Sequence, residues 1–74
     1  MNASNYLVQW MEREEKKGLF VKASFDDVVN QAIAIAEQHY CEVQIHQAAK
    51  LIGVVKKNAL GKLQFEPCMQ NWAA

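Results

Sequence analysis

Apolar side chains recur at helical spacing most clearly between residues 25 and 40. Six of them share one face of a helix drawn through this stretch: Val28, Val29, Ala32, Ile33, Ala36 and Tyr40. Ser24 comes directly before the stretch and Asp27 follows three residues later, which approximates the capping box found at many helix starts. The sequence therefore predicts a helix from Phe25 to about Tyr40, with its apolar face in the core.

A second group of apolar residues lies near the start of the chain. Its members fall at positions i, i+1, i+4 and i+5 and are Tyr6, Leu7, Trp10 and Met11. A polar run follows to Lys17, and Gly18 suits the left-handed residue that often ends a helix. These features predict a helix over residues 4–17. Residues 19–23 are compatible with one short strand or with an extended connector.

The stretch from residue 45 to residue 65 has two short apolar segments on either side of Gly53. One interpretation makes both segments helical. Residues 45–52 then place Ala48, Ala49 and Ile52 on one face, and Gly53 fits a tight turn because it has no side chain. Residues 56–63 form the second helix.

The order Gln-Ala-Ala-Lys-Leu-Ile-Gly-Val, with a basic segment after it that ends in Lys-Leu, resembles the helix-turn-helix of Fis and NtrC-type DNA-binding domains over residues 45–63. The positions that match are Gln47, Ala48, Ala49, Gly53, Val54, Lys56, Lys62 and Leu63. Three positions depart from that motif: Val55, Ala59 and Gly61. The resemblance implies a mainly α fold, a small helical domain that leaves room for a short two-stranded element. It also implies a DNA-binding protein that regulates transcription.

The same resemblance implies which side chains contact duplex DNA. Lys56, Lys57, Asn58 and Lys62 would face the major groove, and Gln47 and Lys50 would reach phosphates at its edge. The chemistry suits these roles, because asparagine makes a paired contact to adenine and lysine reaches the acceptors of guanine. The lysines are equally compatible with an ordinary solvated surface.

A different interpretation makes residues 42–66 extended. Val43 and Ile45 alternate with polar residues in a strand over 42–47, and residues 61–67 form another strand that Pro67 ends. With residues 19–23 they would build a small sheet packed on the main helix, an α+β domain. Compact proteins of this size, such as inhibitors carried by phages and other mobile elements, act by occluding a partner's surface. This alternative therefore predicts a protein–protein interaction module.

Length and charge limit both interpretations. The chain has 74 residues, 51% of them hydrophobic, which is typical of one ordered domain over residues 1–74. The hydrophobic core of a domain this small stabilises the fold only marginally by itself. We therefore expect a homodimer. The net charge of zero argues against a protein that coats nucleic acid non-specifically. The charge is bipolar, however: −3 over residues 1–42 and +3 over residues 43–74.

The remaining chemistry is sparse. The sequence contains no Ser/His/Asp set, no glycine-rich phosphate loop and no paired carboxylates in a predicted cleft, so we expect the protein to have no enzymatic activity. His39 and His46 lack nearby donors that would complete a metal site, so we expect no metal and no cofactor. Cys41 and Cys68 do not form a Cys-x-x-Cys pair and are expected to be free thiols. With no apolar run near the ~20 residues that span a bilayer, and no secretion signal, the sequence predicts a cytoplasmic protein without a membrane segment.

Overall fold

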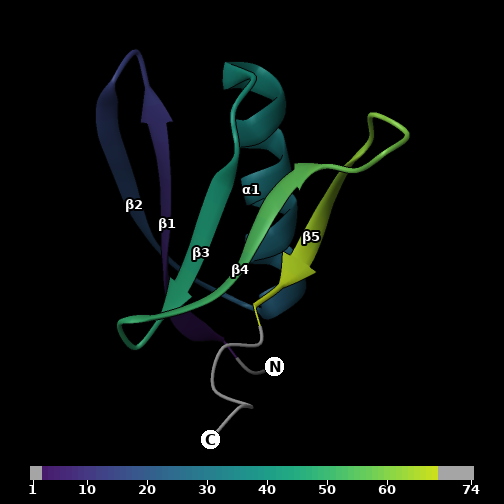
Figure 1. The fold of residues 1–74 in the computed structure, drawn as a ribbon. Coiled ribbons are helices and arrows are strands. Elements are labelled where there is room, and N and C mark those ends of the chain that lie inside the picture. Colours follow the sequence, from purple (N-terminus) through teal and green to yellow (C-terminus); the bar gives the residue numbers. More distant parts are fainter. Residues whose placement is uncertain (1–2, 69–74) are drawn as a thin grey trace, which may run out of the picture.

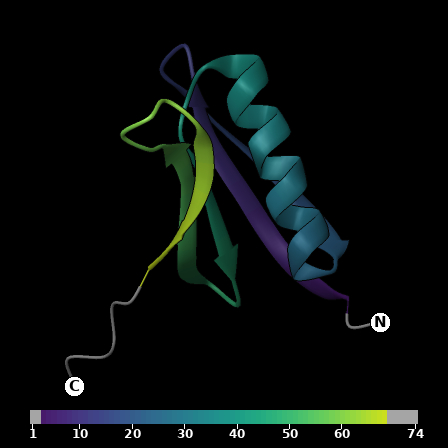
Figure 2. The ribbon, with the colours of Figure 1, turned by 90° about the vertical axis from the view of Figure 1, so that its right-hand side faces the viewer.

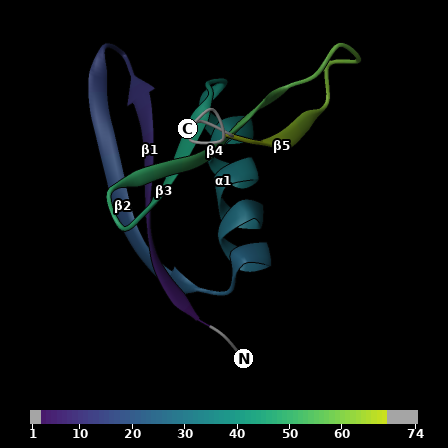
Figure 3. The ribbon, with the colours of Figure 1, turned by 60° about the horizontal axis from the view of Figure 1, so that its bottom comes forward.

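The computed structural model describes residues 3–68, which form a five-stranded antiparallel sheet with one helix packed on one of its faces (Figures 1 and 2). The elements in chain order are β1 (Ser4–Glu12), β2 (Glu15–Ala23), α1 (Phe25–His39), β3 (Val43–Gln47), β4 (Lys50–Lys57) and β5 (Leu63–Pro67). The strands lie in the order β2-β1-β3-β4-β5. β2 and β5 are therefore the two edges, and Figure 3 shows them on opposite sides of the molecule.

The helix predicted over residues 25–40 is confirmed as α1. The Ser24 hydroxyl accepts a hydrogen bond from the Asp27 amide at 3.2 Å, and Asp26 and Asp27 place negative charge in the first turn, where the helix dipole favours it. Tyr40 ends the helix in the left-handed conformation, with φ 54°. These signals are local, which explains why the sequence alone located this element.

The core lies between α1 and the sheet. Its buried side chains are Tyr6, Val8, Val28, Ala32, Ala36, Val43, Ile45 and Val55. Two of the three helical members are alanines, and their small side chains let α1 approach the central strands closely. The ring of Phe65 fills the space above Gly53, and Phe25 meets that ring edge-on with the centroids 5.2 Å apart.

The prediction of a helix over residues 4–17 is wrong. These residues form β1, a turn at Arg13 and Glu14, and the start of β2, so Gly18 lies inside a strand and does not end a helix. The strand considered for residues 19–23 is confirmed as the second half of β2. Residues 4–12 form a strand because their apolar side chains alternate with a period of two. Tyr6 and Val8 point into the core, and Leu7 points away from it.

The prediction of a helix-turn-helix over residues 45–63 is also wrong. The Fis and NtrC-type resemblance and the mainly α fold that it implied are wrong with it. Residues 45–52 lie in β3, a turn at Ala48 and Ala49, and the first part of β4, which continues through Gly53 to Lys57. Residues 56–63 contain the end of β4 and a loop, with no helix. The α+β alternative is close, because the strands it placed over 42–47 and 61–67 are confirmed as β3 and β5. The sheet is larger than that alternative expected, so the fold is mainly β.

The turn between β3 and β4 is strained. Ala48 and Ala49 both have positive φ, 53° and 64°, where two-residue hairpin turns strongly prefer Asn-Gly. We expect Ala48→Asn combined with Ala49→Gly to raise the free energy of unfolding by about 1–2 kcal/mol, because a left-handed alanine is unfavourable by about that much. Urea denaturation followed by circular dichroism measures the change.

Ala59→Gly is the matched control for that pair, because Ala59 lies in the β4–β5 loop and does not have positive φ. It removes an alanine methyl without relieving strain and adds only chain entropy to the unfolded state. A small loss of stability is expected. An equal gain from Ala59→Gly, or no gain from the double substitution, would show that the β3–β4 turn stores no strain.

Candidate functional site

The face of the sheet opposite α1 carries a row of side chains across four strands. Phe20 on β2 is paired with Leu7 on β1, Leu7 with His46 on β3, and His46 with Leu51 on β4. Directly paired residues lie on the same face, about 4.5–5.5 Å apart between their Cβ atoms. We call Phe20, Leu7, His46 and Leu51 the apolar row, because three of the four side chains are apolar; the fourth is the imidazole of His46, whose Nε2 lies 3.4 Å from Gln44 Oε1. The row lies away from α1, because the residues on either side of Leu7 are buried in the core.

Among residues 3–68, no helix or strand packs on the face of the sheet opposite α1 (Figure 2). Phe20 is 82% exposed, and Met11, on the same face, is 54% exposed. Leu7 and Leu51 are half-buried but are not among the residues packed against the core. A hollow of about 330 Å³ lies beside the row, with Leu7, Phe20 and the strained turn at Ala48 and Ala49 in its lining. The face therefore presents apolar surface to solvent around a shallow concavity.

Charge on this open face is positive at the β2 side. Lys16 and Lys22 are paired with Met11 and Asn5 of β1 and so share the face, and neither makes an ion pair with another residue of the described chain. At the β5 side, Glu66 pairs with Lys56 at 3.5 Å. The β2 end of the apolar row therefore lies on the same strand as two lysines that form no ion pair among the described residues, whereas the Lys56–Glu66 ion pair lies further along β4, five residues from Leu51.

The side chains that the sequence assigned to DNA contact fall into two groups. Gln47 and Lys50 flank the β3–β4 turn, whereas Lys56 and Lys57 end β4 and are followed by Asn58 and Lys62 in the next loop. Lys50 and Lys57 are seven strand residues apart, which corresponds to about 23 Å. The structure therefore does not bring the six residues together on one element that could enter a groove.

Asn58 has an internal role in the β4–β5 loop. Its side-chain oxygen accepts hydrogen bonds from the amides of Leu60 and Lys62 at 2.8 and 3.0 Å, and its amide nitrogen donates to Gln64 at 3.1 Å. These bonds satisfy loop amides that no strand pairs, and they fix the loop shape. The Asn58 side chain is therefore occupied within its own loop.

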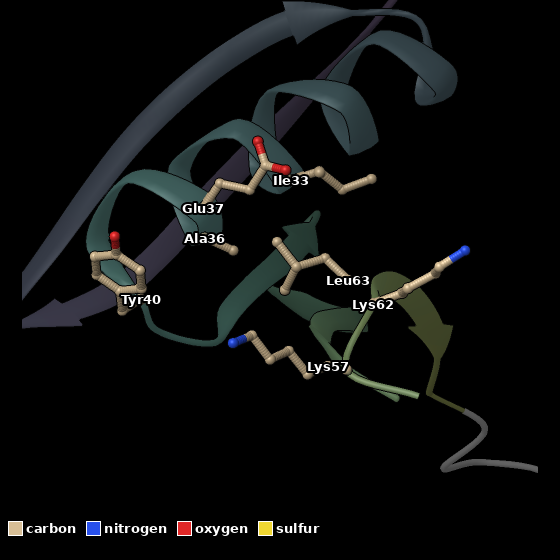
Figure 4. A pocket seen from close by; sticks show the side chains of 8 residues that line it. Ile33, Ala36, Glu37, Tyr40, Lys57, Lys62 and Leu63 are labelled. Carbon is tan, nitrogen blue, oxygen red and sulfur yellow. The ribbon is translucent and has the colours of Figure 1, made fainter. Parts of the chain in front are cut away.

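A cleft of about 580 Å³ separates the end of α1 from this loop (Figure 4). Figure 4 shows Leu63 pointing across it toward Ala36, with Lys57 extending toward Tyr40 and Lys62 pointing away. Glu37 lies at the α1 side, and the end of a helix carries partial negative charge. These charges offset the lysines, so the cleft is an apolar groove with a mixed rim and is not an anion site.

The histidines and cysteines do not assemble a reactive centre. His39 stacks on Trp10 with the ring centroids 6.1 Å apart, while His46 lies on the open face. Burial raises the pKa of the Cys41 thiol, and the negative charge of Glu12 adds to the rise, which disfavours the nucleophilic thiolate. Within residues 3–68, no group of three potential metal ligands occurs and no helix is long and apolar enough to cross a membrane.

Leu7, Phe20 and Leu51 were not among the candidate site residues predicted from the sequence. The signal for Leu7 was present in the alternation Tyr-Leu-Val-Gln-Trp over residues 6–10, which also fits a strand with one face toward the core. Comparison of the chain with protein-family models, curated proteins and solved structures returned no match. The candidate site therefore rests on the geometry of this chain alone.

Proposed function

We propose that this chain is a small, non-enzymatic protein-binding module that docks the open face of its sheet on a partner protein and thereby occludes the partner's surface. The observation that carries the proposal is the uncovered apolar row, with Phe20 82% exposed. Burying a phenylalanine or leucine side chain contributes about 1.5–3 kcal/mol. Apolar side chains exposed next to one another on an uncovered sheet face are typical of interaction sites.

The partner's chemistry follows from the border of the row. A complementary surface has an apolar patch to cover Leu7 and Leu51, with aspartate or glutamate side chains facing Lys16 and Lys22. Such charges speed association and orient the two proteins more than they add affinity. Association is therefore expected to slow as salt is added, while the dissociation rate depends mainly on the apolar contacts.

Duplex DNA is not the partner that we propose. The helix-turn-helix that would have read it is absent, and the six assigned side chains lie in two groups at opposite ends of β4. The free cysteines Cys41 and Cys68 suit a reducing compartment, so the proposal keeps the cytoplasmic location expected from the sequence. It also keeps a homodimer as the form in which the module acts.

The test uses a photo-crosslinking amino acid at position 51, on the open face, and at position 60, in the β4–β5 loop, within the native cells. Adducts specific to position 51 are identified by mass spectrometry, and the partner is purified. Calorimetry then measures its affinity for the original chain and for Leu51→Lys. We expect Leu51→Lys to weaken binding at least about tenfold, because it places a charge inside an apolar contact.

Leu60→Lys is the matched control, because Leu60 is 83% exposed but lies outside the apolar row. It should leave the affinity unchanged, and circular dichroism checks that both variants are folded. Equal loss from both substitutions contradicts the proposal. So does tight binding of duplex DNA at low salt that Lys56→Ala with Lys57→Ala abolishes, since that result assigns the function to the lysines.

A further inference from the structure

The two edges of the sheet differ in their capacity to accept another strand. β5 has five residues, and the hydrogen bonds from Asn58 to Lys62 and from Cys68 to Ile52 show that its even-numbered residues face β4. The backbone groups of Leu63, Phe65 and Pro67 therefore point away from β4 at the sheet edge, and Pro67 has no amide hydrogen to donate. β5 is short and blunted by proline, as protected edges commonly are.

β2 is nine residues long and contains no proline. In a two-residue hairpin the residues that flank the turn, here Glu12 and Glu15, form a hydrogen-bonded pair, and such pairs alternate along the ladder. Lys16, Gly18, Phe20 and Lys22 therefore direct their backbone groups away from β1. Figure 1 shows β2 as the outermost strand at the left, whereas α1 lies behind β3 and β4. Within residues 3–68 this edge is long, regular and not paired with another strand.

Three antiparallel registers align the outward backbone groups of at least three of these four residues on two copies of β2. Pairing Gly18 with Phe20 of the second copy places Lys16 opposite Lys22, which like-charge repulsion disfavours. Pairing Gly18 with Gly18 leaves each Phe20 opposite a lysine. Pairing Phe20 with Phe20 places the two rings together, sets Leu19 opposite Val21 on the other face, and puts Lys22 opposite the small Gly18. The third register matches apolar residues on both faces and opposes no like charges.

We propose that two copies of this chain pair through β2 in an antiparallel register centred on Phe20, which joins their sheets into one continuous ten-stranded sheet. The occupant of the free edge is a second copy because the edge is self-complementary in this register. Leu19, 44% exposed, and Phe20, 82% exposed, are both covered by the pairing. The two apolar rows meet end to end at Phe20, so the dimer presents one docking surface twice as long as that of a single copy.

The first test is sedimentation equilibrium of the full chain over a wide concentration range. The original chain is expected to form dimers. Phe20→Lys places two charges opposite each other at the centre of the contact and should raise the dimer dissociation constant at least about tenfold. Leu60→Lys, at an equally exposed site in the β4–β5 loop, should leave the constant unchanged. A monomeric original chain, or a dimer unaffected by Phe20→Lys, overturns the proposal.

The second test fixes the register by cysteine cross-linking. Phe20→Cys should form a disulfide between the two copies of residue 20, because Cα atoms of a hydrogen-bonded pair lie about 5.5 Å apart, within disulfide range. Gly18→Cys and Lys22→Cys should not form such symmetric disulfides, and peptide mapping separates all of these from Cys41 and Cys68. A rapid symmetric disulfide at residue 18 would overturn the register. Loss of the dimer in Leu51→Lys would instead assign the contact to the open face and overturn edge pairing, independently of whether that face binds another protein.

Discussion

Gly53→Ala is expected to lower the free energy of unfolding by about 2–3 kcal/mol, as overpacking a closely packed core does. A Cβ atom built at Gly53 runs into the ring of Phe65 and lies 2.7 Å from the backbone oxygen of Glu66. The ring packs edge-on against Phe25, and the Glu66 oxygen belongs to the β4–β5 ladder, so neither neighbour moves without disturbing core packing or strand pairing. Chemical denaturation followed by circular dichroism measures the loss.

Gly18→Ala provides the matched control within a strand of the same sheet. A Cβ atom there meets its nearest neighbour, Leu7 Cδ1, at 3.6 Å, which is ordinary van der Waals contact. The free energy of unfolding should stay the same or rise by up to about 1 kcal/mol, because alanine restricts the unfolded chain. If both alanine substitutions have equal effects, the close approach of Phe65 to Gly53 is not what requires glycine.

Combining Gly53→Ala with Phe65→Ala tests the cause directly. Removing the ring opens the space that the new methyl needs, so the double variant should lose less stability than the two single losses predict together. Strict additivity would mean that the Glu66 backbone, and not the ring, limits the site.

Ile45→Ala is expected to lower the free energy of unfolding by about 3–4 kcal/mol, the size found when a large aliphatic side chain is removed from a rigid core. Ile45 is fully buried, lies on the central strand β3, and is the largest of the fully buried side chains. A chain of this length has a total stability of roughly 4–11 kcal/mol. Thermal denaturation should therefore show a strongly reduced melting temperature, or no folded state at all.

The comparison for Ile45→Ala is Leu60→Ala. Leu60 is 83% exposed in the β4–β5 loop, so truncation removes little buried area and should change stability by less than about 0.5 kcal/mol. A loss at Ile45 no larger than that at Leu60 would contradict the placement of the core between β3 and α1.

The errors in the sequence interpretation concentrate at the hairpin turns. Arg13, Glu14, Ala48 and Ala49 all adopt positive φ, yet none is the glycine or asparagine that announces such a turn. Arginine, glutamate and alanine favour helices, so both hairpins read locally as helical. The sheet overrides this preference because the strands on either side bury Val8 and Ile45.

Gly53 illustrates the same limit at one residue. The sequence places a glycine between two apolar segments, which suits the tight turn of a helix-turn-helix. In the folded chain it lies within β4, where the absence of a side chain admits the ring of Phe65 from the neighbouring strand. A close approach between two strands cannot be distinguished from a turn until the strand pairing is known.

The sequence by itself determined α1, because its cap at Ser24, its acidic first turn and its apolar spacing act within a few residues of one another. It also supplied the strands β3 and β5 as one of two interpretations. Only the tertiary structure decided between them, and only it decided that β1 lies between β2 and β3, because strand order depends on contacts far apart in the chain. The apolar row is a product of that order: Phe20, Leu7, His46 and Leu51 are scattered in sequence and become neighbours only across paired strands.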